Sequence, residues 1–214
     1  MMTDRLEKIF ALIPECDTFA DIGCDHGYIA NAMLKSSKAK KVIIADISAK
    51  CLEKAEQLLE ENIKDGSAIS VVSNGFDKVP SCDTALIAGM GGEEICDIIS
   101  MAKTLPNTLI LQPMKNCDKV RLCAVKSGYC IKKDFMFKSA GKFYDLMLLH
   151  KGKDSLTDEE IEFGRDNLDG QNQDFKEFLK IKISRLETYL KSKNLSIEDR
   201  KSMLLLKEKF EKYV

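Results

Sequence analysis

The sequence lacks three features that would narrow its class at once: a CxxC pair, a long apolar run and an excess of one charge. Eight cysteines occur in 214 residues, yet no two stand three positions apart, so we expect neither a zinc site nor a disulfide framework. No apolar run reaches the roughly 18 residues that suggest a membrane span, and no secretory leader is recognised. We therefore expect a cytoplasmic protein with free thiols, no metal and no membrane contact.

The charge balance excludes a global electrostatic attraction to nucleic acid or to a membrane. The net charge is −1, with 44% hydrophobic and 31% charged residues. Such a chain can bury a sizeable core beneath a well-solvated surface. Its length allows one domain with an appendage. Any binding of nucleic acid must then come from a local patch.

The segment Phe19–Gly27, FADIGCDHG, is a short apolar run followed at once by small and acidic residues. A helical pattern then begins, which predicts a strand, a tight turn and a helix start. Such a turn presents backbone N–H groups and the positive end of a helix to a ligand. The dinucleotide fingerprint fails because Asp25 and Tyr28 stand where its later glycines belong. Asp25 would also repel a pyrophosphate.

The pattern acid-x-Gly-x-Gly-x-Gly fits better, with Asp21, Gly23 and Gly27 in place and Asp25 at the middle glycine. This pattern is typical of proteins that bind S-adenosylmethionine, whose sulfonium cation tolerates nearby carboxylates. Asp46 ends a second apolar run and can accept hydrogen bonds from ribose hydroxyls. We favour S-adenosylmethionine; a nicotinamide cofactor and a plain turn without a ligand stay open as alternatives.

Strand and helix patterns alternate along the first two thirds of the chain. Strands are predicted at 19–23, 42–46, 69–73, 84–88 and 108–112, and helices at 1–15, 28–35, 49–64, 93–102 and 118–127. Apolar strands with helical crossovers predict a doubly wound parallel sheet. Two further strands, 130–137 and 142–150, joined by KSAG, predict a closing antiparallel hairpin. This is the class I, Rossmann-like arrangement of methyltransferases.

Ligands bind at the carboxyl ends of the strands in such sheets. Cofactor contacts are therefore expected at Asp21, Gly23, Cys24, Gly27, Asp46, Ile47, Asn74, Gly75, Phe76, Asp77, Ala88, Gly89, Met90 and Gly91. Asp77 can accept from an adenine amine, although Asn74-Gly75 also reads as an ordinary turn. The glycines of 89–92 are interpreted as a floor for a flat substrate. Gln112 is placed to read a base edge.

After Gly152 the pattern changes to amphipathic helices with capping boxes at Thr157–Glu160 and Ser196–Asp199. Two apolar seams follow at helical spacing: Phe175, Leu179, Ile183, Leu186 and Leu190, then Met203, Leu206, Phe210 and Tyr213. They predict an antiparallel, coiled-coil-like helical hairpin joined near Asn194. We divide the chain into a methyltransferase domain, 1–152, and a helical arm, 153–214, interpreted as a nucleic-acid-binding element; a packing or dimer element is the alternative.

Charge also separates these segments. From 172 to 214 there are eleven Lys and Arg against seven Asp and Glu, whereas an acidic surplus lies at 154–174. Basic side chains on the hairpin can follow a phosphate backbone. Solvated helix faces are the simpler alternative.

Four segments, DIGCDHGYIA, AGMGGEEI, LILQP and GKFYDLML, together resemble the bacterial tRNA adenine-N1 methyltransferases of the TrmK type. The resemblance covers about Arg5 to Gly152. It implies a class I fold, S-adenosylmethionine as methyl donor and a tRNA substrate methylated at adenine twenty-two of the D-arm region. The chain departs from the family in having Cys24 for serine, Asp46 for glutamate, Met114 for asparagine, and no proline after Gly164.

The resemblance and the chemistry together suggest roles for individual residues. Asp25 is expected to stabilise the cationic product base or hold its amino group, and His26 to orient the base or Asp25; a helix cap and a turn residue are the alternatives. Substrate contacts are expected from Arg5, Gly92, Gln112, Pro113, Lys115, Lys180 and Arg185. The loop at 89–92 lacks the Asn/Asp-Pro-Pro-aromatic motif of exocyclic-amine methylases, which favours a ring nitrogen.

Other functions stay open on sequence alone. These are methylation of another substrate, and an S-adenosylmethionine-binding RNA-interaction protein without turnover, for which Met114 is the argument. Asp25 disfavours a nicotinamide oxidoreductase. We expect a monomer or weak homodimer without an obligatory protein partner.

Overall fold

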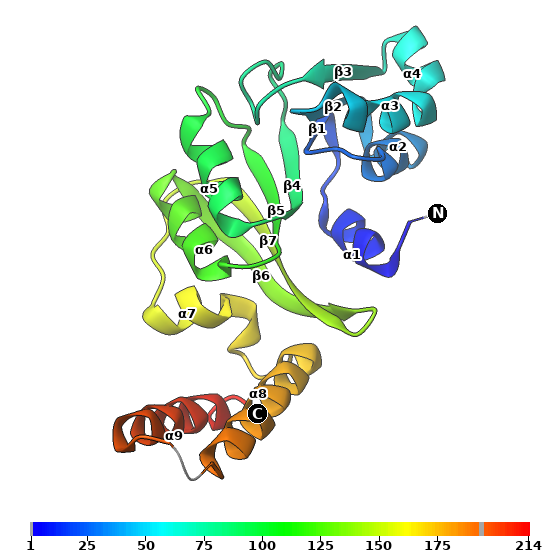
Figure 1. The fold of residues 1–214 in the computed structure, drawn as a ribbon. Coiled ribbons are helices and arrows are strands. Elements are labelled where there is room, and N and C mark those ends of the chain that lie inside the picture. Colours follow the sequence, from blue (N-terminus) through cyan, green and yellow to red (C-terminus); the bar gives the residue numbers. More distant parts are fainter. Residues whose placement is uncertain (1, 193–194) are drawn as a thin grey trace.

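The computed structural model describes residues 2–192 and 195–214, and its core is a seven-stranded sheet with the order β3-β2-β1-β4-β5-β7-β6 (Figure 1). The strands are β1 (Cys16–Ile22), β2 (Ala39–Asp46), β3 (Ala68–Val72), β4 (Thr84–Met90), β5 (Thr108–Pro113), β6 (Tyr129–Ser139) and β7 (Lys142–Lys151). The first five run parallel, β7 runs antiparallel to β5, and β6 antiparallel to β7. The predicted class I, Rossmann-like sheet is confirmed.

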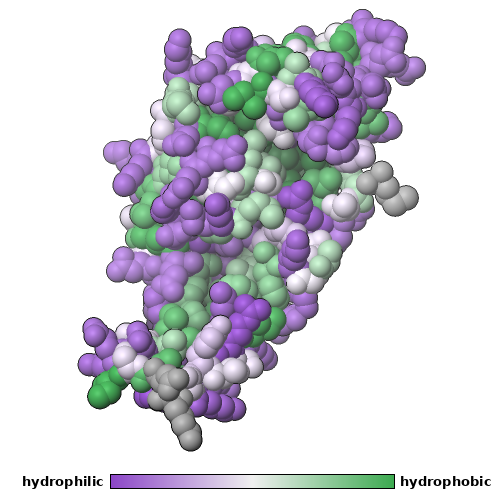
Figure 2. Space-filling view, viewed as in Figure 1, coloured by the Kyte–Doolittle hydropathy of each residue, from purple (hydrophilic) through white to green (hydrophobic). Residues whose placement is uncertain are grey.

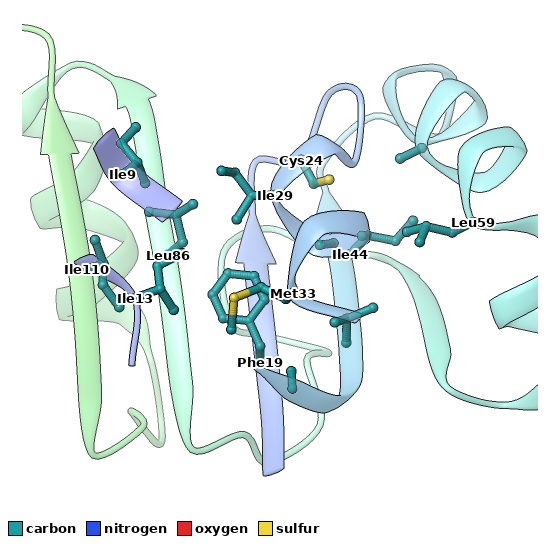
Figure 3. Close-up of a cluster of buried hydrophobic side chains, with 14 of the residues drawn as sticks. Ile9, Ile13, Phe19, Cys24, Ile29, Met33, Ile44, Leu59, Leu86 and Ile110 are labelled. Carbon is teal, nitrogen blue, oxygen red and sulfur yellow. The ribbon is translucent and has the colours of Figure 1, made fainter. Parts of the chain in front are cut away.

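Helices cover both faces of this sheet. They are α1 (Asp4–Leu12), α2 (Tyr28–Lys35), α3 (Ala49–Leu58), α4 (Glu60–Asp65), α5 (Gly92–Met101) and α6 (Cys117–Lys126). Side chains alternate between faces along each strand: in β1, Phe19 joins the cluster under α1 to α4 and Ala20 the cluster under α5 and α6. Figure 3 shows the first cluster, where Ile9, Ile29 and Met33 meet the strands.

Several predicted boundaries shift. The helix expected at 1–15 runs from Asp4, capped by Thr3, to Leu12, and Met1 lies outside the described residues. The helix expected at 49–64 is two helices, because Leu59 leaves helical geometry (φ −107°, ψ 17°). This kink keeps Leu59 buried beneath Gly27. The KSAG connection shrinks to a tight turn in which Ala140 and Gly141 both have positive φ, as a type I′ hairpin requires.

The C-terminal region contains α7 (Asp158–Phe163), a 3-10 turn (Arg165–Asn167), α8 (Gln173–Leu190) and α9 (Ile197–Glu211). The predicted helical hairpin is therefore present, and its expected connection near Asn194 falls on residues outside the described ranges. Thr157 and Glu160 form the predicted capping box, and Ser196 caps α9 by accepting from the Asp199 N–H. Phe175, Leu179 and Phe210 form the buried part of its seam, whereas Leu206 is exposed.

The acidic segment 154–174 has a structural use that its charge alone did not reveal. Strand β6 is the outer strand of the sheet, and its free N–H groups would otherwise lack partners. Side chains of this segment accept from four of them: Asp154 from Ile131, Asp166 from Asp134, Asn167 from Met136, and Asp174 from Lys138. The acidic surplus thus caps the sheet edge and fastens the helical hairpin to it.

A buried ion cluster joins α6, β6 and β7 at the same junction. Arg121 donates to both oxygens of Asp134, to Asp145, and to the carbonyls of Ile161 and Glu162. Gly164 passes so close that a Cβ there would lie 2.7 Å from the Arg121 guanidinium.

Hydrophilic side chains cover much of the face shown in Figure 2. No helix within the described ranges combines the length and apolar character that a membrane crossing needs.

Arg165 stands where the resemblance predicted a proline after Gly164. Its guanidinium donates to Asp154, to Glu160 and to the carbonyls of Ile131 and Ser155. The arginine therefore ties the start of the C-terminal region to the sheet edge by hydrogen bonds, which a proline cannot do.

Candidate functional site

The turn after β1 is built around two glycines in the left-handed region. Gly23 has φ +78°, and a Cβ there would lie 1.9 Å from the methyl carbon of Met90. Gly27 has φ +69°, begins α2 as its N-cap, and faces Ala55. The Gly23 and Cys24 N–H groups both donate to the Ala45 carbonyl. Only glycine fits either position, and the turn is held against β2.

Two cavities open beside this turn at the carboxyl ends of the strands. The first, about 330 Å³, lies between α1 and the turn and is lined by Arg5, Asp21, Asp25, His26 and Gly89, among others. The second, about 250 Å³, is lined by Asp46, Ile47, Asn74, Gly75 and part of α5. Gly23 and Met90 line both cavities. The two spaces therefore border the same glycine turn, with the Met90 side chain packed on Gly23 where they adjoin.

The predicted donor S-adenosylmethionine fits this arrangement. The flexible Met90 side chain packs against Gly23, and carboxylates line the cavities on both sides of the turn. The carboxylate of Asp46 lines the second cavity, with one oxygen accepting from the Ser48 N–H. Asp21 lines the first. These groups would hold a ribose and a cationic end of the ligand, respectively.

Asp21 is a buried carboxyl group with an unusual protonation equilibrium. Burial raises its pKa from 3.8 to about 6, and a hydrogen bond with Cys24 opposes this rise only in part. Burial also raises the pKa of the Cys24 thiol, which stays neutral. Cys24 thus supplies the same neutral hydrogen-bonding role that a serine would have here. A bound cation would favour the charged form of Asp21.

The predicted catalytic pair, Asp25 and His26, lies together at the cavity entrance. Asp25 Oδ2 is 2.6 Å from His26 Nδ1, and Lys54 Nζ is 3.6 Å from Asp25 Oδ1 and 3.5 Å from His26 Nε2. The His26 and Tyr28 rings stack at 5.4 Å with an interplanar angle of 12°. The sequence analysis assigned no site role to Lys54 or Tyr28. Lys54 lies on a separate helix, α3, and nothing in the sequence indicates that it reaches this turn.

Arg5, a predicted substrate contact, lines the first cavity. It donates to the side chain of Gln112 at 2.5 Å and lies over the ring of Tyr144 at 5.8 Å. The buried Gln112 amide also donates to the Pro113 carbonyl. Gln112 therefore positions Arg5 in this structure, and Arg5 faces the space where Gln112 was expected to read a base. Tyr144, on β7, was missed by sequence reasoning.

Not every predicted contact faces a cavity. Ala88 and Met90 line the first, whereas Phe76 packs into the core and neither it nor Asp77 lines either space. Gly92, at the start of α5, has a packing role: its N–H donates to the Lys115 carbonyl, and a Cβ there would lie 2.5 Å from the Asn116 carbonyl. Gly91 stands next to the Lys115 side chain.

The second cavity has a wall that the sequence reasoning overlooked. Glu94, Asp97, Ile98 and Met101 of α5 line it, together with buried Ser73 at the end of β3. Their spacing of three, one and three positions places them on one helical face. That periodicity was the available signal.

The remaining predicted substrate contacts lie away from the cavities. Pro113 is buried at the end of β5, and Lys115 is exposed just after it. Lys180 and Arg185 are exposed on α8, which lies beyond the β6–β7 hairpin (Figure 1). Met114 is also exposed, with its sulfur 3.6 Å from the Gln112 amide nitrogen.

Comparison with known proteins gives a consistent result. A family model described as a methyltransferase domain matches residues 2–147. The chain is 27% identical over 161 residues to the tRNA (adenine(22)-N(1))-methyltransferase of Bacillus subtilis, covering 71% of this chain and 66% of that protein. Across three curated relatives the match spans 62% to 70% of their own lengths.

Solved structures extend the likeness to the whole chain. M. capricolum TrmK in complex with S-adenosyl-homocysteine has a TM-score of 0.86 and 27% identity, covering 100% of this chain and 97% of that one. The B. subtilis M1A22 tRNA methyltransferase TrmK has a TM-score of 0.83 at 20% identity, covering 100% and 98%, and shares the fold. The chain therefore belongs to the methyltransferase-domain family, as a member of its TrmK-type group.

Proposed function

We propose that this protein is an S-adenosylmethionine-dependent tRNA methyltransferase that methylates N1 of an adenine in the D-arm region. The observation that carries the proposal is the pair of cavities that share Gly23 and Met90 in their linings, with Asp21 lining one and Asp46 lining the other. The M. capricolum TrmK described above was solved with S-adenosyl-homocysteine, the product of this cofactor, and the B. subtilis relative is named as a tRNA (adenine(22)-N(1))-methyltransferase.

The chemistry asks little of the protein beyond positioning. N1 of adenine carries a free lone pair and has no proton to lose, so it can attack the methyl carbon without a strong general base. When bound, S-adenosylmethionine supplies that electrophilic methyl group. Holding two reactants in line accounts for much of such a rate enhancement. The chain must therefore free the base from pairing, at a cost of roughly a few kcal/mol, and hold it beside the glycine turn.

Charge at the cavity entrance suits the product. Methylation at N1 leaves the adenine cationic, and Asp25 lies at the cavity entrance with more than half of its side chain exposed. A carboxylate near developing positive charge lowers the barrier. We assign Asp25 this role, and we assign Arg5, which lines the same cavity, the role of contacting the RNA.

We further propose that residues 153–214 form a tRNA-binding arm, with Lys180 and Arg185 contacting phosphates. Both side chains are exposed on α8. Because Asp154, Asp166 and Asp174 cap strand β6, deleting the arm at Lys153 would also uncover the sheet edge. Point substitutions therefore test the arm more cleanly than truncation.

The direct test is labelled-methyl transfer from S-adenosylmethionine to unmodified bacterial tRNA transcripts, followed by nucleoside analysis. We expect N1-methyladenine, and we expect it to disappear when the D-arm adenine is replaced by uracil. Methyl transfer to another base or position would overturn the assigned specificity. Measured S-adenosylmethionine binding without transfer to any tRNA would overturn the enzymatic assignment.

A further inference from the structure

The stacked pair of His26 and Tyr28 has a use beyond the contacts described so far. Three sides of the His26 ring are already occupied: Nδ1 by Asp25, Nε2 by Lys54, and one ring face by Tyr28. Nevertheless 41% of the side chain is exposed. His26 lines the first cavity, so part of this exposed surface opens into it, and within the described residues the ring face turned away from Tyr28 has no aromatic stacking partner.

We propose that this open face of His26 is the stacking platform on which the unpaired target adenine lies; the inference rests on the proposed function. His26 and Tyr28 both line the first cavity, beside Gly89 and Arg5. Proteins that hold unpaired nucleotides stack their bases on aromatic side chains, since every base offers a π face. A base placed here would extend the existing pair into a three-layer stack.

The two charged neighbours explain how the platform is held in place. A histidine on a turn can rotate about two side-chain bonds, and its ring would present different faces in different rotamers. Asp25 holds one nitrogen and Lys54, from α3, lies within reach of the other. Lys54 is therefore a positioning residue: it fixes the plane of the ring and does not touch the base.

Phosphate binding is the competing role for Lys54, and the two roles predict different salt dependences. Removing a phosphate contact reduces the salt slope of RNA binding by about one. Removing a positioning residue weakens binding without changing that slope. Lys50, exposed one turn earlier on α3, provides a matched control.

The test compares His26→Phe, which keeps an aromatic face but loses both hydrogen bonds, with His26→Asn, which keeps a donor near Asp25 but loses the face. If the face is the platform, His26→Asn raises the KM for tRNA by about 5- to 150-fold, the range of one aromatic stack, and His26→Phe raises it less. S-adenosylmethionine binding, measured by calorimetry, should change little in either. Equal losses in both variants would overturn the platform.

A second readout follows the base itself. A tRNA transcript with 2-aminopurine at the target position should stay quenched when bound to the parent protein and to Tyr28→Phe. It should brighten with His26→Asn, in which the base is unpaired but unstacked. Brightening of equal size with the parent protein would contradict the platform. Failure of the parent protein to methylate any tRNA would instead overturn the proposed function, so the two failures are distinguishable.

The positioning role is tested with Lys54→Met beside Lys50→Met. We expect Lys54→Met to raise the KM for tRNA about threefold to tenfold, with the salt slope unchanged, and Lys50→Met to leave both as they are. A slope that falls by about one in Lys54→Met would assign the lysine to a phosphate instead.

Discussion

Two clusters in this molecule combine a cation with carboxylates, and they differ mainly in burial. Arg121 and Asp134 are 0% exposed and Asp145 14%, whereas His26, Asp25 and Lys54 are 41%, 56% and 59% exposed. Arg121 makes five hydrogen bonds within the buried cluster, which cover its guanidinium and the Asp134 carboxylate completely, while Asp145 at the edge lines a separate cavity of about 520 Å³. The open cluster leaves more than half of the Asp25 side chain and part of the His26 ring exposed, although Asp25 pairs with His26 and Lys54. Similar chemical groups thus serve structure in one place and are available for ligand binding in the other.

The largest effect should come from breaking the buried cluster. Arg121→Met would leave Asp134 and Asp145 charged, buried and without their partner. Removing one member of a buried ion pair typically costs about 3–5 kcal/mol of unfolding free energy. Urea unfolding followed by circular dichroism measures this. Lys119→Met is the control, because Lys119 lies on the same helix as Arg121 and its ion pair with Glu93 of α5 is exposed. An equal loss of stability in Lys119→Met would refute the distinction between buried and exposed pairs.

Breaking the open cluster should affect turnover instead of stability. Asp25→Ala removes a carboxylate that is more than half exposed, so the unfolding midpoint should stay near that of the parent protein. We expect kcat for tRNA methylation to fall by about 100-fold, with S-adenosylmethionine affinity affected much less. Asp17→Ala serves as the control, because Asp17 lies near the start of β1, at the end opposite to the glycine turn. Equal losses of cofactor affinity and turnover would assign Asp25 to the cofactor or the loop.

The neighbouring glycines Gly91 and Gly92 allow a second comparison between a tightly packed position and an open one. In Gly92→Ala the new methyl group would press on the Asn116 and Lys115 carbonyls, and overpacking of this kind costs about 1–3 kcal/mol. In Gly91→Ala it would meet only the flexible Lys115 side chain at 3.2 Å, with φ at −66°. Thermal unfolding should separate the two variants. Equal stability with lost tRNA binding would restore the floor interpretation of Gly92.

The C-terminal arm carries exposed basic side chains on α8, and the buried cluster fastens the start of the arm through α7. The double variant Lys180→Met/Arg185→Met should weaken tRNA binding about tenfold at moderate salt, and should lower the salt slope by about one for each charge removed. Fluorescence anisotropy at several salt concentrations gives both values. Lys64→Met, on α4, is the matched control. An unchanged slope would place the tRNA elsewhere.

The smallest effect concerns Asp21, buried but still facing the cavity. Its pKa of about 6 means that it is mostly protonated at pH 5 and mostly charged at pH 7. A cationic ligand needs the charged form, so S-adenosylmethionine affinity should fall about tenfold from pH 7 to pH 5. Calorimetry in matched buffers measures this, and Asp21→Asn should abolish the trend.

The same group affects folding with the opposite sign. Because burial raises the pKa of Asp21 above its ordinary 3.8, the folded state holds this proton more tightly than the unfolded state does. Its contribution to stability is therefore full at low pH and is lost as pH rises through about 6. Relative to Asp21→Asn, the parent protein without ligand should lose stability between pH 4 and 6.

The sequence predicted the elements that follow local rules. Alternating apolar strands and helices revealed the sheet, and the spacing from Asp21 to Gly27 revealed the turn. It did not reveal Arg121, since an arginine on a helix usually faces solvent. Nor did it show that Gly92 serves packing, or that Asp166 and Asp174 cap a strand edge. Those roles depend on contacts between segments distant in the chain, which carry no periodic signal.

The most direct test of the proposed chemistry replaces one atom of the substrate. A tRNA with 1-deazaadenosine at the target position keeps the exocyclic amine but has C–H in place of N1. We predict that the protein binds this tRNA with near-normal affinity and transfers no labelled methyl group to it. Methyl transfer to the deaza base at a comparable rate would show that the exocyclic amine or another atom is the acceptor, and would contradict the account.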